Sequence, residues 1–400
     1  MLSTILAATI ALSPVQPDPA IAKSLGTASA EFTVELLRAF PHDNGNTFFS
    51  PYSIQSALWM AGTGAHGKTR EEIRKALHLG LDDAAANGFS AVSQIIEDTS
   101  AAKKPDRAPA NWQPPMLRSA NRLWYSGGLD IHKSYTAALE QSFRAQAEKL
   151  DFNKPARAAK AINSWVSNVT AGRINQLVSA DLIPEQGLVL TNAVYFKAGW
   201  SKKFHPLKSV DFTSSAGKAT KPEGMVEDSS FEYQQLKGAQ VVRMHYEGDA
   251  SMTIILPDAG KMESVLGALD LKTITPRQTA RKVVVTMPKF KTAQQSSIAA
   301  VLQKLGITTA FDPAAADFEG ITAAKPTYIS EVIHAANIDV DENGTEAAAA
   351  TAVAITKSAE IVPSSKPIRF TVDRPFIFYI SNTTSGTVLF AGIINDPTSK

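Results

Sequence analysis

The 400-residue sequence contains no cysteine, so disulfide bonds, thiolate metal sites and a cysteine nucleophile are all excluded. A strong charge of either sign is also missing, because 40 Lys and Arg residues against 38 Asp and Glu residues leave a net charge of +2. That balance gives no support for binding to nucleic acid or to an acidic surface. The absence of cysteine leaves the compartment open, because a secreted protein can also lack it.

The sequence patterns of common catalytic sites are missing as well. None of the seven histidines belongs to H-E-x-x-H or to a similar metal-binding spacing. There is no G-x-S-x-G turn, which would present a serine nucleophile. We interpret His334 as a satisfied buried residue rather than as a base. The sequence therefore predicts a protein that is not an enzyme and that uses neither a metal nor a cofactor.

The apolar run at residues 2–12 is too short to span a bilayer. It has the character of the apolar part of a secretion signal, although the basic residues that normally precede one are absent. We therefore treat residues 1–26 as an N-terminal tail or signal-like segment. A secreted or periplasmic location is predicted, with the cytoplasm as the alternative.

Residues Gly62–Thr69 match the phosphate-binding pattern G-x-x-x-x-G-K-[ST]. That loop binds phosphate only when a buried strand precedes it and a helix follows it. Residues 53–61, however, have helical spacing, and Ser53 is placed to cap a helix that runs through Met60. We interpret the segment as a glycine-rich turn between helices, with a P-loop NTPase as a disfavoured alternative.

Several apolar segments predict the strands of a large core. Leu188–Phe196 is almost continuously apolar, which is typical of a strand covered on both faces. Asn192 within it needs hydrogen-bond partners, since leaving it unpaired costs about 1–3 kcal/mol. Candidate partners are Ser53, Ser56 and His334. Two further strands are predicted by the alternating run at residues 332–340 and the apolar run at residues 370–380.

The segment between these last two strands, Glu342–Pro363, alternates in an unusual way. From residue 345 onward, the odd-numbered residues are small or apolar. The even-numbered residues begin with Glu346, the only charged residue between Gly344 and Lys357. No proline interrupts residues 344–361, so every amide there is able to join a sheet. The sequence predicts an exposed loop that can also become an interior strand, with these residues inward: Thr345, Ala347, Ala349, Thr351, Val353 and Ile355.

These segments carry a family resemblance. The sequence from Glu342 to Thr351 resembles the hinge of a serpin reactive-centre loop, and Phe370–Phe378 resembles the serpin signature that follows it. Residues 64–69, 162–174 and 317–321 resemble further serpin segments, so the resemblance runs from about residue 27 to residue 398. Within Phe196–Trp200 the glycine lies one place later than in the family pattern.

The resemblance implies an α+β serpin fold. Its features would be a large mixed central β-sheet, two smaller sheets, eight or nine helices and an exposed reactive-centre loop. Residues 27–400 would form a single domain, with the loop at about residues 342–366. The protein would be a monomer. The implied function is irreversible suicide-substrate inhibition of serine proteases, with cysteine proteases as a second target class, by insertion of the cleaved loop into the central sheet. The alternative is a non-inhibitory serpin, such as a carrier or chaperone.

The resemblance also implies roles for individual residues. The hinge would comprise Glu342, Gly344, Thr345, Glu346, Ala347, Ala348, Ala349, Ala350 and Thr351. A polar shutter beneath the sheet would comprise Ser53, Ser56, Asn192 and His334. The breach at the top of the loop path would comprise Trp200, Lys289 and Glu342.

Three bonds remain open as the site of cleavage. Lys357–Ser358 suits a trypsin-like protease, because an acidic specificity pocket accepts lysine. Ser358–Ala359 and Ile361–Val362 suit elastase-like or subtilisin-like enzymes. The predicted partner is thus a serine protease, and neither nucleic acid nor a membrane is expected to bind.

Overall fold

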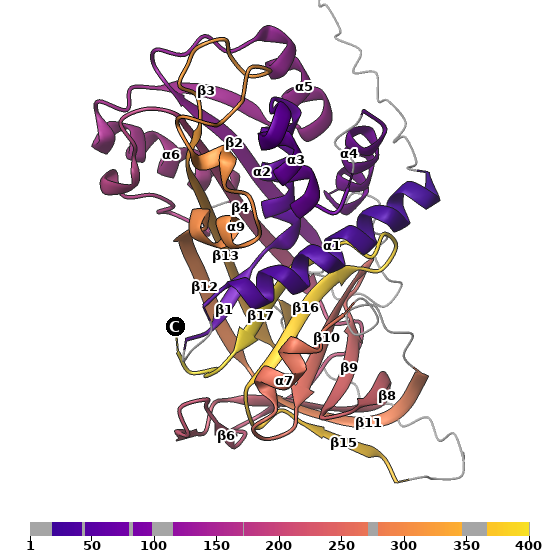
Figure 1. Ribbon diagram of the computed structural model, residues 1–400. Helices are drawn as coiled ribbons and strands as arrows, with labels where there is room; N and C mark the ends of the chain where they lie inside the picture. The colour runs from indigo at the N-terminus through magenta and orange to yellow at the C-terminus, as the bar shows by residue number, and fades with distance from the viewer. Residues whose placement is uncertain are drawn as a thin grey trace, which may run out of the picture.

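The computed structural model describes residues 18–41, 45–79, 83–97, 115–170, 172–270, 279–345 and 366–399 (Figure 1). Helices surround one end of a β-rich body, and long strands form the other end. The α-helices in these residues are α1 Pro19–Ala39, α2 Pro51–Thr63, α3 Gly67–Ala76, α4 Asp83–Glu97, α5 Lys133–Phe143, α6 Pro155–Val169, α7 Met262–Gly267 and α9 Ala299–Lys304. Short 3-10 helices lie at η2 Ala180–Leu182 and η3 Thr309–Phe311.

Among the described residues, six strands form a central sheet in the order β12-β13-β14-β4-β2-β3. The sheet is mixed, because β13 runs parallel to β4 and β2 runs parallel to β3, while its other pairs are antiparallel. Its strands are β2 Met116–Ser126, β3 Gln146–Leu150, β4 Leu188–Gly199, β12 Phe290–Ser297, β13 Ile329–Asp341 and β14 Gly344–Thr345.

In the described part of the chain, a second sheet contains nine strands, in the order β1-β17-β16-β10-β9-β8-β11-β15, with β5 beside β8. The long strand β8 pairs with β11 along most of its length and with β9 near its end, so two smaller sheets become one hydrogen-bonded surface. The strands are β1 Thr47–Phe49, β5 His205–Leu207, β8 Gly224–Leu236, β9 Ala239–His245, β10 Ala250–Pro257, β11 Thr279–Pro288, β15 Ile368–Thr371, β16 Phe376–Asn382 and β17 Val388–Ile394. A separate hairpin joins β6 Phe212–Thr213 to β7 Ala219–Thr220.

Strand β4 is buried on both faces, as its continuous apolar sequence predicts. Val189 and Ala193 face a core cluster that includes Ile162 and Val166 of α6. The alternate residues, such as Leu190, join the main core with residues of α2 and of the second sheet. Polar side chains in the middle of β4 are therefore sealed from water, which determines the chemistry of Asn192.

Helices α1 and α2 both pack against β17, and α1 crosses in front of β17 and β16 in Figure 1. The start of α2 differs from the prediction. The cap is Ser50, whose Oγ accepts a hydrogen bond from the Ser53 amide at 3.1 Å. Pro51 then occupies the first helical position, where a missing amide proton costs nothing. Ser53 is thus not the cap but the third residue of the helix.

The Gly62–Thr69 segment is a turn between helices, as we interpreted it. Gly62 and Thr63 end α2, and α3 begins at Gly67. Lys68 is exposed and pairs with Glu72 at 3.6 Å, while the Thr69 hydroxyl accepts a hydrogen bond from the Asp317 amide at 3.0 Å. A helix therefore precedes this loop in place of the strand that a P-loop requires.

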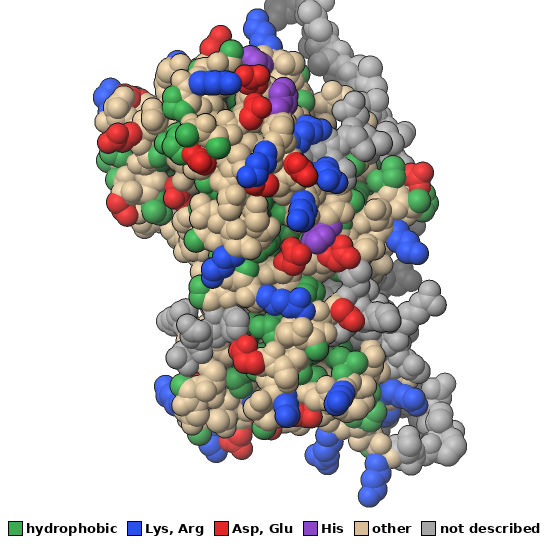
Figure 2. Space-filling view, viewed as in Figure 1, with side chains coloured by type: hydrophobic (Ala, Val, Ile, Leu, Met, Phe, Trp, Pro, Cys, Tyr) green, Lys and Arg blue, Asp and Glu red, His purple; other side chains and the backbone are tan. Residues whose placement is uncertain are grey.

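Charges of both signs are mixed over the surface in Figure 2, without a continuous basic or acidic region on the visible face. This agrees with the small net charge of the chain. Among the described residues, the helices lack the combination of length and apolar character that crossing a bilayer requires.

Candidate functional site at the opening of the central sheet

The two residues of β14 lie between β13 and β4. Gly344 and Thr345 pair with Asp341 and Val340 on one side and with Gly199 and Ala198 on the other. Further along, β13 and β4 pair directly with each other, from Ile329 and Leu188 to Ala336 and Val194. The central sheet is thus closed along part of one seam and opened at its end by the first residues of the predicted loop.

Thr345 is fully buried in this position. A hydrogen bond of 2.7 Å joins its hydroxyl to that of Tyr246, and burial raises the pKa of Tyr246, which stays protonated. The Tyr246 ring in turn stacks on Trp200 with ring centroids 4.2 Å apart. We call these three residues the hinge latch. Sequence reasoning did not single out Tyr246, because a lone tyrosine after a strand carries no distinctive pattern.

Of the three breach residues, Trp200 belongs to the hinge latch, and Glu342 lies three residues before Thr345. Lys289 pairs with Glu342 at 2.8 Å and with Glu223 at 3.2 Å. Partial burial opposes ionisation of Glu342, but the hydrogen bond and charge of Lys289 outweigh it and lower the Glu342 pKa. The Trp200 indole donates to the Asp341 carbonyl at 2.9 Å. Because the ion pairs are partly solvated, each contributes about 0–1 kcal/mol, and their main effect is to fix position.

The shutter residues Asn192 and His334 face each other across the closed part of the seam. The His334 Nε2 atom accepts a hydrogen bond from the Ser50 amide at 3.0 Å, so the proton is on Nδ1, which contacts Asn192 Oδ1. The Asn192 amide donates to the Ser53 carbonyl at 2.6 Å. Burial lowers the pKa of His334 to about 3, so the ring is neutral at physiological pH.

The two shutter serines do not use their hydroxyls as the sequence suggested. Ser53 contacts Asn192 through its carbonyl, and its buried hydroxyl has no hydrogen-bond partner among the described residues. The Ser56 hydroxyl donates to the Tyr52 carbonyl at 2.9 Å, so it does not serve Asn192. Ser50 contributes instead, since its amide binds His334 and its hydroxyl binds the Leu389 carbonyl at 2.6 Å. The Ser50-Pro51 pair is a helix-start signal that could have revealed it.

We expect the neutral His334 to make stability fall in acid. Between about pH 6.5 and pH 3 the unfolded chain binds one more proton at this residue than the folded protein does. The free energy of unfolding should therefore decrease by about 1.4 kcal/mol per pH unit as the pH falls through this range. The measurement is the difference in unfolding free energy between wild type and His334→Gln at several pH values. A difference that stays constant from pH 6 to pH 4 would contradict the assignment.

The hydrogen bond in the hinge latch should be measurable by a double-mutant cycle. Tyr246→Phe or Thr345→Val alone leaves one buried hydroxyl unpaired, which costs about 1–3 kcal/mol. The double variant removes both hydroxyls and should cost less than the sum, with a coupling energy of about 1 kcal/mol. Urea unfolding of the four proteins gives these values. Tyr233→Phe, which removes a partly exposed hydroxyl that donates to Gln235 at 2.7 Å, should cost less than either single variant, because water can replace that contact.

The remaining predicted site residues, 346–351 of the hinge and 357–359 and 361–362 at the candidate cleavage bonds, lie outside the described residues. Their roles stay predictions. The roles of the shutter and breach residues also stay predictions, although the structure brings Asn192 to His334 and Lys289 to Glu342.

Comparison with known proteins identifies the fold. The family model described as Serpin (serine protease inhibitor) matches residues 27–397. An uncharacterized serpin-like protein of Thermococcus kodakarensis is 38% identical over 94% of this chain and 86% of its own length. The leukocyte elastase inhibitor of Bos taurus is 33% identical over 94% of this chain and all of its own length.

Solved structures of serpins show the same fold. The crystal structure of human thyroxine-binding globulin in complex with thyroxine superposes with a TM-score of 0.82 at 27% identity, covering 95% of this chain and 100% of that one. The predicted α+β fold with its mixed central sheet is confirmed. The chain belongs to the serpin family.

Proposed function

We propose that this protein is an irreversible suicide-substrate inhibitor of serine proteases. In this mechanism the loop is cleaved as a substrate, and the acyl-enzyme is trapped when the cleaved loop inserts into the central sheet. The observation that carries the proposal is the position of Gly344 and Thr345, which pair with both β13 and β4 at the open end of a seam that is closed from Ile329 to Ala336. Insertion would then extend a strand that has already begun.

The sequence beyond Thr345 supports continued insertion. If the alternation continues, the next inward residues are Ala347, Ala349 and Thr351, which are small enough to pass between strands without displacing their neighbours. Bulky or charged residues at these positions would favour the alternative, a carrier that is not an inhibitor. The relative that binds thyroxine shows that the same fold can serve a binding role.

The class of protease follows from the bond that is cleaved. Lys357 would direct the protein to trypsin-like enzymes, whereas Ser358 or Ile361 would suit elastase-like or subtilisin-like ones. A relative named as an elastase inhibitor is compatible with the second group. Secretion would bring the protein to such proteases, and it remains a prediction from residues 2–12.

The test is to mix the protein with trypsin, an elastase or subtilisin at near-equal ratios and to denature the products in detergent. We expect a covalent band at the summed mass with at least one protease. The first residue of the released C-terminal peptide then identifies the cleaved bond. Clean cleavage by all three, with no covalent band, would favour the carrier alternative.

A further inference from the structure

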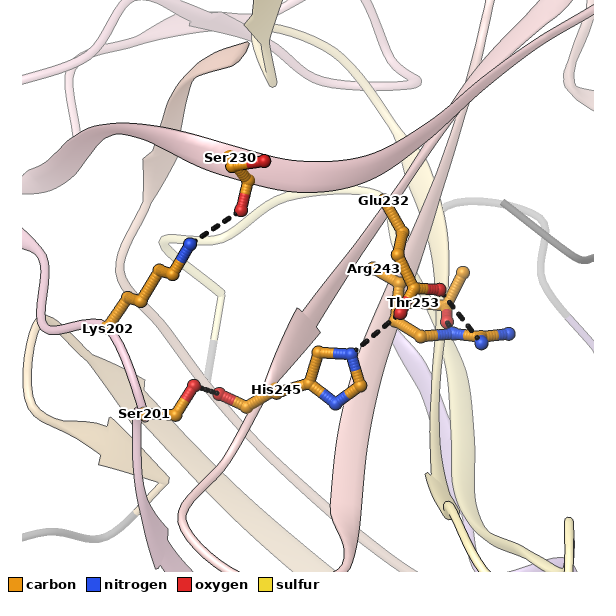
Figure 3. A network of polar contacts seen from close by, with 7 residues as sticks. All are labelled: Ser201, Lys202, Ser230, Glu232, Arg243, His245 and Thr253. Carbon is orange, nitrogen blue, oxygen red and sulfur yellow. Dashed lines mark hydrogen bonds and ion pairs between the residues drawn. The ribbon is translucent and has the colours of Figure 1, made fainter. Parts of the chain in front are cut away.

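A second polar cluster lies on strands β8, β9 and β10, away from the shutter (Figure 3). The Glu232 carboxylate contacts His245 Nε2 at 2.8 Å and Arg243 Nη1 at 3.1 Å. The Nε atom of Arg243 donates to the Thr253 hydroxyl at 3.3 Å. The single carboxylate of the cluster is therefore held between two nitrogen-bearing side chains, and neither is free to move without breaking a contact.

Lys202 approaches the same region from the segment that follows Trp200. Its ammonium donates to the Ser230 carbonyl at 2.7 Å and lies 5.6 Å from the centre of the Phe231 ring. Both partners are uncharged, and among the described residues no carboxylate oxygen lies within ion-pair distance of this ammonium. In Figure 3 the Lys202 ammonium and the His245 ring stand on opposite sides of an open space.

That space is a pocket of about 190 Å³. Such a volume holds about six water molecules, or one small organic molecule of similar size. Its apolar wall includes Trp200, Phe231 and Met244, all nearly fully buried, and Ala280 of β11 borders it. Its polar wall consists of Lys202, Glu232, Arg243 and His245.

The charges of the residues that line the pocket indicate which charge a ligand would carry. Among the residues that line the pocket, Lys202 and Arg243 contribute two positive charges and Glu232 contributes one negative charge. Because the guanidinium of Arg243 is already engaged by Glu232 and Thr253, the ammonium of Lys202 is the better placed partner for a ligand. The buried rings beside it favour an apolar body, as in most small-molecule sites.

We propose that this pocket binds a small organic monocarboxylate. The carboxylate would lie against the Lys202 ammonium, with the His245 ring on the other side, and the apolar body would pack on Phe231 and Trp200. The proposal does not rest on the proposed inhibitory function, because the described residues that line the pocket do not include any of the predicted loop. The site does share Trp200 with the hinge latch, so a bound ligand would touch the outer side of that aromatic stack.

The experiment uses benzoate as the probe and the full chain as the protein. Benzamide, which has the same shape without the charge, is the control ligand, and isothermal titration gives both affinities. We expect benzoate to bind at least ten-fold more tightly than benzamide. Equal affinities, or no binding of benzoate, would overturn the proposal.

Three variants test the location. Lys202→Met keeps an apolar stem but removes the charge and should weaken benzoate binding at least ten-fold. Ala280→Phe should fill the pocket from β11 and reduce binding similarly without altering any charge. The matched control is Lys203→Met, which removes the next lysine, an exposed residue that does not border the pocket, and should leave affinity unchanged. All altered residues are exposed, so the variants should fold, and similar melting temperatures would establish this. Binding that survives in Lys202→Met and Ala280→Phe would place benzoate elsewhere and contradict the assignment.

Discussion

Thr345→Arg is expected to abolish the covalent trapping of a target protease while leaving the loop open to cleavage. Thr345 is fully buried between β13 and β4, and its hydroxyl forms a hydrogen bond with the hydroxyl of Tyr246. An arginine there would bury a charge without a partner, which costs several kcal/mol, so the hinge would stay outside the sheet. The measurement is the yield of the detergent-stable complex, which should fall by at least ten-fold while cleaved inhibitor accumulates.

Glu346→Arg is the matched control for this variant. Glu346 is the next residue and has the opposite parity, so the same arginine would point away from the core if the alternation continues. We expect its complex yield to stay close to that of the wild type. If Thr345→Arg trapped protease as well as Glu346→Arg does, insertion past Thr345 would not be part of the mechanism.

Cleavage of the loop is expected to raise the melting temperature by roughly 10 °C, which is the second large effect. A cut after Lys357 would free residues 346–357 to insert along the seam that now joins β13 to β4. Burial of Val353 and Ile355 would contribute about 1.5–3 kcal/mol each, in addition to the new backbone hydrogen bonds. Calorimetry before and after limited proteolysis measures the change in melting temperature. This measurement does not depend on whether the protease is trapped.

The cleaved Thr345→Arg protein separates insertion from a general effect of cutting. If stabilisation comes from insertion, this variant should melt at nearly the same temperature before and after cleavage. A rise in the cleaved wild type together with an equal rise in the cleaved variant would mean that the new strand does not enter through Thr345.

The strands that build the central sheet could be predicted well, because burial on both faces leaves a direct record in the sequence. Leu188–Phe196 lies within β4, and residues 332–340 lie within β13.

The ends of helices were harder to predict from the sequence. Helix α1 begins at Pro19, within the residues 1–26 that we treated as a tail or signal-like segment, because Asp18 caps it and Pro19 suits its first turn. Such capping signals are short and local, so they are easily missed.

The candidate site divides in the same way. Lone polar residues in apolar strands were detectable, and Asn192 and His334 do contact each other. Their other partners include backbone groups of Ser50 and Ser53, which any residue type could supply, so only the helix-start signal at Ser50-Pro51 pointed to one of them. Tyr246 was missed for a different reason: its contacts to Trp200 and Thr345 depend on the tertiary fold alone.

Gly344 makes the position of the hinge sensitive to a single methyl group. Its φ of +151° is one that other residues rarely adopt, and a Cβ atom there would lie 2.1 Å from the Ala198 carbonyl oxygen and 2.7 Å from the Cα of Gly199. Both obstacles are backbone atoms of β4, so no side chain can rotate away to make room. At this one position, the entrance to the seam therefore admits glycine but no residue with a side chain. Any substitution of Gly344 would shift the balance toward an expelled loop without touching the residues that a protease reads.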